Sequence, residues 1–260
     1  MARAETTLVV LRTERLSPDL VRVHLGGPGL ADFQPNGFTD AYVKLAFPGA
    51  DGEDPVLRTY TVRSYDPQAG ELAIDFVVHG DAGVAGPWAR EAREGQTLVL
   101  RGPGGAYRPD PDADWHLLAG DESALPAIGA ALEALGADAR GQVFVEVSGP
   151  EGEIALPAPA GVEVTWLHRG HAAADAPEDR AGRQAPLVSA VREAPWWGGR
   201  VQVFVHGEAE AVMKGVRPYI RRERAVPAAD ASISGYWRRG RTEEGFRVWK
   251  RELAVAEAPA

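Results

Sequence analysis

An arginine and a tyrosine two residues apart are the side chains in this sequence whose spacing first suggests joint chemistry. Arg58 and Tyr60 lie in the stretch 56–63, whose composition predicts a β-strand. Side chains at i and i+2 of a strand point to the same face, so the guanidinium and the ring project together, with Thr59 and Thr61 on the other face. A guanidinium binds phosphate in bidentate fashion and an aromatic ring offers a stacking surface, so the pair suits a ligand with a phosphate and a flat ring system. The alternative is a solvated arginine beside a tyrosine that packs across strands.

A glycine-containing loop is the second candidate for phosphate binding. The predicted strand 72–78 is followed by His79, by glycines at 80, 83 and 86, and by Pro87, which starts a short helix. Free N–H groups at a helix N-terminus attract anions, so a diphosphate could lie there. The alternative is an ordinary turn that closes a barrel.

A third candidate is a strand–glycine–helix junction. The short apolar strand 115–119 precedes Gly120, and residues 124–135 have helical composition. Ligands of open α/β sheets bind beyond the carboxyl ends of the strands, where this turn would lie. The junction is not a G-x-G-x-x-G fingerprint, and Asp121 and Glu122 would repel a phosphate placed against them or cap the helix instead.

The elements that position these residues change character near residue 110. The first part predicts six short strands separated by Gly, Pro and Asn turns, and six strands at this spacing favour an antiparallel β-barrel. The predicted strands are 6–11, 21–25, 43–47, 56–63, 71–78 and 96–101.

In the second part apolar strands alternate with helices, which indicates a doubly wound, mainly parallel α/β sheet. The strands are predicted at 115–119, 142–147, 162–167 and 201–206, and the helices at 124–135, 186–193 and 208–224. Pro218 predicts a kink or an early end of the last helix, and residues 172–184 predict a loop. We therefore expect a barrel over residues 1–110 and an α/β domain over 111–260 that ends in a basic helix.

Composition excludes several classes of function. The 260 residues contain no cysteine, so thiolate-bound clusters, disulfides and a cysteine nucleophile are excluded, and an electron carrier must be organic or belong to a partner. The net charge of −9 argues against nucleic-acid binding, yet residues 214–251 hold eleven Lys or Arg against four Asp or Glu and could receive an anion. His168 and His171 lack a third ligand at metal-site spacing, and Ser123 lacks the G-x-S-x-G context of a hydrolase, so we expect neither a metal site nor acyl transfer.

The chain shows no sequence signal for a membrane or for export. No apolar run approaches the roughly 20 residues that span a bilayer. The N-terminus lacks an apolar segment with a cleavage site. We expect a cytoplasmic protein without membrane insertion.

Taken together, these motifs resemble the siderophore-interacting protein family, a branch of the ferredoxin-reductase-like flavoproteins. The resemblance covers nearly the whole chain and rests on motifs in a fixed order: Arg58-Thr59-Tyr60-Thr61-Val62-Arg63, Asp75-Phe76-Val77-Val78-His79-Gly80 with Trp88-Ala89, Gly102-Pro103-x-Gly105, Gly120-Asp121-Glu122-Ser123-Ala124-Leu125-Pro126-Ala127, His206-Gly207-Glu208 and Gly235-Tyr236-Trp237-Arg238-Arg239-Gly240.

The resemblance implies an FAD-binding barrel, an NADH- or NADPH-binding second domain, and reduction of a ferric siderophore to release Fe(II). Arg58 would contact the FAD phosphate, Tyr60 would stack on the isoalloxazine, and Thr61 would lie near its N5 atom, which makes Tyr60 and Thr61 the catalytic candidates. The further cofactor-binding candidates are Thr59, Val78, His79, Val84, Ala85, Trp88, Gly120, Asp121, Ser123 and Ala124. Family members commonly have Gly-Pro-Ala-Ser where this chain has its shifted proline at 87 and no hydroxyl, so the single phosphate contacts of residues 83–88 stay open.

The resemblance also gives the basic residues a role, because many ferric siderophores are anionic. Lys44, Arg239, Arg241 and Lys250 are the candidates for drawing the substrate toward the flavin. The alternative for the last three is a solvated helix over 238–251 with Phe246, Trp249 and Leu253 as its buried stripe.

Other interpretations remain open at this stage. The electron acceptor could be a protein such as ferredoxin, or the chain could be a non-catalytic module that binds an anionic ligand. For the nucleotide, Ser148, Glu151 and Glu153 follow a strand end as expected for the free ribose of NADH, whereas Arg169 could serve the 2′-phosphate of NADPH.

Overall fold

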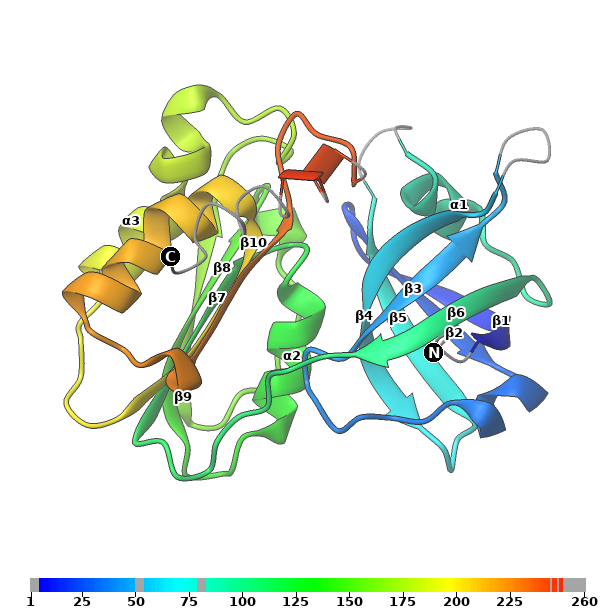
Figure 1. Ribbon diagram of the computed structural model, residues 1–260, viewed down its shortest axis with the longest axis horizontal. Coiled ribbons are helices and arrows are strands. Elements are labelled where there is room, and N and C mark those ends of the chain that lie inside the picture. Colours follow the sequence, from blue (N-terminus) through cyan, green and yellow to red (C-terminus); the bar gives the residue numbers. More distant parts are fainter. Residues whose placement is uncertain (1–4, 50–53, 79–82, 244, 247, 250–260) are drawn as a thin grey trace.

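The computed structural model describes residues 5–49, 54–78, 83–243, 245, 246, 248 and 249. It consists of a closed β-barrel followed by a five-stranded sheet flanked by helices (Figure 1). Helix α2 (Leu125–Ala134) lies between the sheet and the barrel. Among the described residues no helix is long and apolar enough to span a bilayer.

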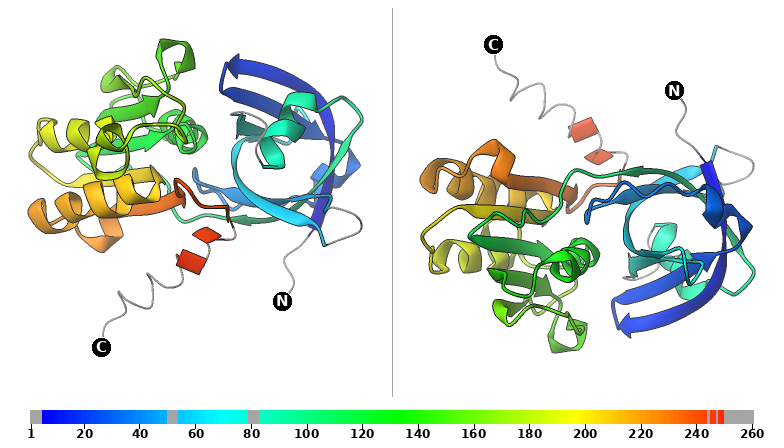
Figure 2. Two further views of the ribbon diagram at one scale, coloured as in Figure 1. Left: turned by 90° about the horizontal axis from the view of Figure 1, so that it is seen from above. Right: turned by 90° about the horizontal axis from the view of Figure 1, so that it is seen from below.

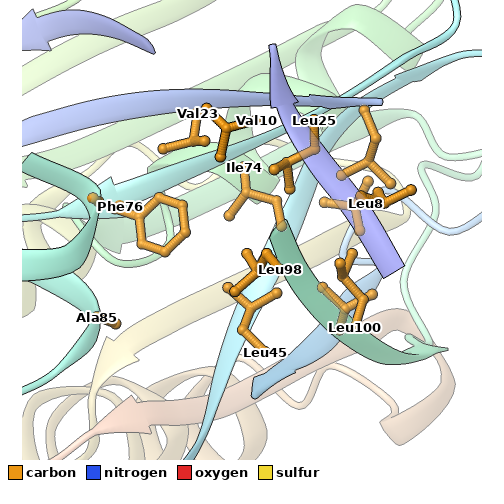
Figure 3. Close-up of a cluster of buried hydrophobic side chains, with 14 of the residues drawn as sticks. Leu8, Val10, Val23, Leu25, Leu45, Ile74, Phe76, Ala85, Leu98 and Leu100 are labelled. Carbon is orange, nitrogen blue, oxygen red and sulfur yellow. The ribbon is translucent and has the colours of Figure 1, made fainter. Parts of the chain in front are cut away.

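The barrel confirms the predicted six antiparallel strands. They close in the order β1-β2-β5-β4-β3-β6, with bounds β1 Glu5–Ser17, β2 Leu20–Gly26, β3 Tyr42–Phe47, β4 Val56–Asp66, β5 Glu71–Val77 and β6 Thr97–Gly104. Because alternate residues of each strand face inward, leucine and valine side chains such as Leu8, Val23 and Leu100 fill the interior (Figure 3). Helix α1 (Ala85–Glu91) buries Ala85 and Ala89 against this core.

The second unit confirms the doubly wound α/β prediction. Its strands are all parallel and ordered β11-β10-β7-β8-β9, with bounds β7 Trp115–Asp121, β8 Arg140–Val147, β9 Gly161–His168, β10 Val201–Glu208 and β11 Ala231–Trp237. Helix α2 packs on one face, and α3 (Pro186–Glu193) packs on the other. Strand β11 was not predicted, because its polar and glycine positions lack the apolar run of the other four.

The helical run that follows β10 differs from the prediction. It continues from residue 209 through 223, close to the predicted 208–224, so of the two outcomes expected at Pro218, a kink or an early end, the early end is wrong. Wide π-helical turns, η6 (Ala211–Val216) and η7 (Tyr219–Glu223), flank the proline. A wider turn shifts the hydrogen bonding away from the i→i−4 pattern that proline interrupts. In the expected loop 172–184 the structure adds two single 3₁₀ turns, η4 (Glu178–Arg180) and η5 (Gly182–Gln184).

Polar and aromatic contacts join the two units. Arg63 of β4 donates to Glu133 of α2 with an Nη1–Oε2 distance of 2.9 Å. The hydroxyl of Ser148, after β8, donates to Asp19 Oδ2 at 2.5 Å. These contacts set β4 against the sheet domain, so the strand that carries Arg58 and Tyr60 lies at the junction of the two units.

Candidate functional site

The pairing of β4 with β3 fixes which way its side chains project. Tyr60 lies opposite Val43 and Arg58 opposite Leu45, both of which belong to the barrel core. Residues directly opposite in an antiparallel pair share a face. Arg58 and Tyr60 therefore lie on one side of β4, as the sequence predicted.

An aromatic cluster supports the Tyr60 ring. The ring centroid of Phe76 on β5 lies 4.5 Å from that of Tyr60 and 5.6 Å from that of Trp88 on α1. Phe47 of β3 contacts Trp88 from the other side, with centroids 5.5 Å apart. The structure thus brings Tyr60 and the 84–88 segment together through Phe76. Phe76 is a site residue that the sequence analysis does not predict, although its place in the two-residue alternation of β5 is a signal for an inward-facing ring.

The start of α1 offers open backbone. Gly83 has a φ of +81°, and a Cβ placed there would meet no atom within 4 Å. Val84 caps α1 without a side-chain hydrogen bond, so the first backbone N–H groups of the helix receive no hydrogen bond from the cap side chain. Val78 is buried and its amide donates to Asp19 O at 2.8 Å, which anchors the end of β5. His79 lies outside the described residues.

A carboxylate from the other end of the chain lies against the same strand. Glu243 Oε2 is 3.7 Å from Arg58 Nε. Its Oε1 accepts a hydrogen bond from the Thr59 hydroxyl at 3.3 Å. Burial raises the pKa of the Tyr60 phenol above its ordinary value, the Glu243 charge adds to this shift, and Arg58 opposes it. Glu243 and Arg58, which lie far apart in the sequence, therefore act in opposite directions on the Tyr60 phenol.

Thr61 lies where the barrel meets the sheet. It is 6% exposed, and its side chain interacts with the phenol of Tyr236 at the end of β11. The Tyr236 ring in turn packs edge-on against His206 of β10, with centroids 4.7 Å apart. Thr61 thus connects β4 to the carboxyl edge of the parallel sheet.

Asp121 is the central acceptor of that carboxyl edge. Its Oδ1 accepts from the Ser123 amide at 2.9 Å and from its hydroxyl at 2.5 Å. Its Oδ2 accepts from the Glu208 amide at 2.7 Å and from Trp237 Nε1 at 2.8 Å. A single carboxylate therefore links the ends of β7, β10 and β11.

The other residues expected in the nucleotide turn pack within the protein. A Cβ on Gly120 would lie 2.5 Å from both Ala124 Cβ and His206 O, so this glycine permits close packing and leaves no open cradle. Ala124 is fully buried, and its amide donates to Asp121 O at 2.9 Å. Gly120, Ser123 and Ala124 thus hold the turn in shape, whereas Asp121 also faces the pocket described below.

Arg169 is buried and pairs with two glutamates. Its Nη2 lies 2.6 Å from Glu122 Oε1 and its Nη1 lies 2.8 Å from Glu146 Oε1. Its Nε donates to His171 O at 3.2 Å. Burial outweighs the arginine and raises the pKa of Glu122 to about 7. A 2′-phosphate would have to compete with these contacts for the Arg169 guanidinium, and the choice between NADH and NADPH stays a prediction.

A pocket opens at the carboxyl ends of the parallel strands. Asp121, Glu146, Arg169, Glu208, Trp237 and Arg239 are among its lining residues. Pockets at this edge of an α/β sheet are the usual place for a nucleotide. Charged groups of both signs and an indole line the walls, which suits a polar ligand with a planar ring.

The predicted basic residues come from β3 and from the segment after β11. Lys44 lies on β3 opposite Thr59. Arg239 lines the pocket, and its Nε donates to Ala174 O at 3.4 Å. Arg241 is exposed, two residues before Glu243. Lys250 lies outside the described residues.

The sequence predicts that His168 and His171 do not belong to a metal site. Within the described ranges no group of three histidine or carboxylate side chains could hold a metal ion. His168 instead pairs with Glu153, with Nε2 and Oε1 at 2.7 Å.

Comparisons with known proteins cover both units. The model of the "Siderophore-interacting FAD-binding domain" matches residues 9–57 and 50–107, and that of "Siderophore-interacting protein" matches 113–240. Ferric vibriobactin reductase ViuB of Vibrio cholerae is 36% identical over 91% of this chain and 90% of its own length. The NADPH-dependent ferric-chelate reductase of Escherichia coli is 39% identical over 49% of this chain and 56% of its own. The crystal structure of the siderophore-interacting protein SipS from Aeromonas hydrophila superposes with a TM-score of 0.83 at 32% identity, over 98% of this chain and 99% of that one.

Proposed function

The chain belongs to the siderophore-interacting protein family, and from this premise we propose that it is an FAD-dependent reductase of ferric siderophores that takes electrons from NADH or NADPH. The observation that carries the proposal is the shared face of Arg58 and Tyr60 at the junction of the two units. One side chain can bind a phosphate there and the other can stack on a ring. We assign residues 1–110 to FAD and residues 111–260 to the nucleotide.

The residues present fit FAD. The open backbone at Gly83 and the start of α1 can receive a diphosphate, and Arg58 supplies a guanidinium on the same side of the barrel. Phe76 holds the Tyr60 ring from behind, so the ring needs little reordering to stack. Bound FAD would supply the conversion between hydride and single-electron transfer: one hydride taken up from the nucleotide would leave as a proton and two electrons, one for each of two Fe(III) ions.

The protein's own residues position the reactants around that chemistry. Thr61, the next residue of β4 after Tyr60, interacts through its side chain with the Tyr236 phenol, and in this proposal it fixes how the carboxyl edge of the sheet lies against the ring site. The pocket at the carboxyl edge, with Asp121 holding three strand ends together, receives the nicotinamide nucleotide. The arrangement supplies no acid–base pair, and electron transfer requires none.

Charge selects the substrate in this proposal. Ferric siderophores bind iron through hard anionic oxygens, so positive charge near the flavin would attract them. Lys44, which pairs with Thr59 of β4, and Arg241, two residues before Glu243, supply that charge. Fe(II) carries less charge than Fe(III) and binds those oxygens less strongly, so reduction releases the iron. We place this reaction in the cytoplasm, where reduced nicotinamide nucleotides are available.

The test begins with the visible spectrum of the purified protein, in which retained FAD gives a flavin absorbance. The protein is then mixed anaerobically with NADH or NADPH and a ferric siderophore, and Fe(II) is captured by a coloured chelator. Bleaching of the flavin by one nucleotide, followed by Fe(II) formation, is expected. The same mixture without iron in the siderophore is the control. If added FAD does not bind, the proposal is wrong. If flavin is bleached but only ferredoxin is reduced, the acceptor is a protein.

A further inference from the structure

The segment after β11 crosses from the sheet domain to the flavin strand. We call residues 238–249 the strap, of which 244 and 247 lie outside the described residues. Figures 1 and 2 show this segment in red, leaving the end of β11 and reaching the side of the barrel. Its Glu243 contacts Arg58 and Thr59, more than 180 positions earlier in the sequence.

Contacts near both ends of the described part of the strap hold it against the sheet domain. Arg238 pairs with Glu210, Nη2 to Oε2 at 3.0 Å, and its guanidinium lies 5.2 Å from the centroid of the Trp249 ring. Phe246 is 4% exposed and packs over Gly235, where a Cβ would lie 3.3 Å from its ring. These contacts hold the Glu243 carboxylate in front of β4.

We propose that Glu243 competes with a ligand phosphate for Arg58, so that FAD binding must displace the Glu243 carboxylate from the guanidinium. This inference rests on the proposed function, in which Arg58 binds the FAD phosphate. A carboxylate 3.7 Å from a guanidinium forms a partial ion pair, and two anions cannot share one guanidinium without mutual repulsion. Glu243 also lies close enough to Tyr60 to shift the pKa of its phenol, so it stands beside the predicted flavin position as well as the phosphate position.

The relative strengths of the two interactions favour exchange. The Arg58 and Glu243 side chains are 20% and 23% exposed, and partly exposed pairs contribute little to stability. A diphosphate carries more charge and can bind a guanidinium in bidentate fashion. We therefore expect FAD to displace Glu243 from Arg58, with an apparent affinity for FAD that is lower than it would be without the strap. In the absence of FAD, Glu243 keeps the Arg58 guanidinium oriented.

The primary experiment is an FAD titration of the flavin-free protein, followed by flavin fluorescence. Glu243→Gln removes the charge and keeps the shape, and we expect it to tighten FAD binding about two- to fivefold, the size of one partly exposed ion pair. Glu223→Gln is the matched control, because Glu223 pairs with Arg192 away from the barrel, and it should leave the affinity unchanged. Unchanged or weaker binding by Glu243→Gln would overturn the inference.

Further measurements distinguish the effect of the Glu243 charge from the effect of the strap's position. In an Arg58→Ala background the gain from Glu243→Gln should vanish, since the competed guanidinium is gone. Phe246→Ala weakens the contacts that hold the strap and should also tighten FAD binding. In the unaltered protein, FAD should speed tryptic cleavage after the exposed Arg241; protection of that bond would contradict displacement.

The outcomes distinguish this inference from the proposed function. If the unaltered protein does not bind FAD, the proposed function fails first. If it binds FAD and reduces ferric siderophore while Glu243→Gln changes nothing, only the competitor role is lost.

Discussion

The ring of Tyr60 on β4 packs against the ring of Phe76 on the adjacent β5, with centroids 4.5 Å apart and planes tilted by 38°. Phe76 is fully buried in the barrel core. The core thus fixes the orientation of a ring that would otherwise be held only by its own strand. A ligand that stacks on Tyr60 meets a surface already in place, which lowers the entropic cost of binding.

This relationship predicts a graded effect of substitutions at Tyr60. Tyr60→Ala should weaken FAD binding about tenfold or more, because it removes a stacking surface, whereas Tyr60→Phe should retain most of the affinity. The measurement is an FAD titration of each variant. Tyr65→Ala is the control, since Tyr65 lies on the same strand but packs against Phe33. Equal affinities for Tyr60→Ala and Tyr60→Phe would exclude stacking.

Lys44 predicts a salt-dependent rate. Lys44→Ala should lower kcat/KM for an anionic ferric siderophore roughly threefold at low salt, and the difference should shrink as salt screens the charge. Steady-state rates at several salt concentrations measure this. Lys214→Ala removes an exposed lysine of the helical run after β10 and should behave like the unaltered protein. A deficit that persists at high salt would indicate a packing role for Lys44.

The buried Arg169 predicts a stability effect that depends on pH. Arg169→Met leaves Glu122 and Glu146 without their counter-charge and should cost about 3–5 kcal/mol in the free energy of unfolding. The pKa of Glu122 already lies near 7, above its value in the unfolded chain. The folded state therefore holds a proton that the unfolded state has lost, and stability falls as pH rises from about 4.5 to 7.

Removing the arginine should enlarge that dependence. The deficit of Arg169→Met, measured by urea unfolding, should be larger at pH 8 than at pH 5, and Glu122→Gln in the same chain should restore part of it. Arg192→Met, which breaks an exposed pair with Glu223, is the control and should cost less than about 1 kcal/mol. The same loss at every pH would show that packing, and not charge, is responsible.

The lowered pKa of Glu71 leads us to expect that folding stability rises with pH in the acid range, the opposite of the effect of Glu122. Its carboxylate accepts hydrogen bonds from Arg12 on β1, with one N–O distance of 2.9 Å, and this lowers its pKa to about 2. A depressed pKa contributes stability that is complete above about pH 4.5 and is lost as pH falls toward 2.

The corresponding measurement compares urea midpoints of the unaltered protein and Glu71→Gln between pH 2.5 and 7. The unaltered protein should be the more stable at neutral pH, and the difference should close below pH 4.5. Glu94→Gln, at an exposed position of the same unit, should show no such closing. A constant difference across the range would mean that the ion pair with Arg12 does not drive it.

Much of the fold followed from local pattern. The six barrel strands and the order of strands and helices in the sheet domain were predicted because alternation and helical composition are short-range properties. Strand β11 was not predicted, because Gly235 and its half-buried neighbours do not form an apolar run. Its parallel pairing with β10 stabilises it in the folded chain. The helix over 208–224 was predicted as well, but its π-helical turns on either side of Pro218 were not, because the sequence pattern does not show how the backbone accommodates a proline.

For the site, local periodicity is enough to predict that Arg58 and Tyr60 share a face, because side chains two apart on a strand point the same way. The contacts of Phe76 with Tyr60, of Arg169 with its two glutamates and of Glu243 with Arg58 could be seen only in the folded chain. Each of these pairings joins residues from different elements. Their distances depend on how the barrel, the sheet edge and the strap pack together, and no periodicity within one segment carries that information.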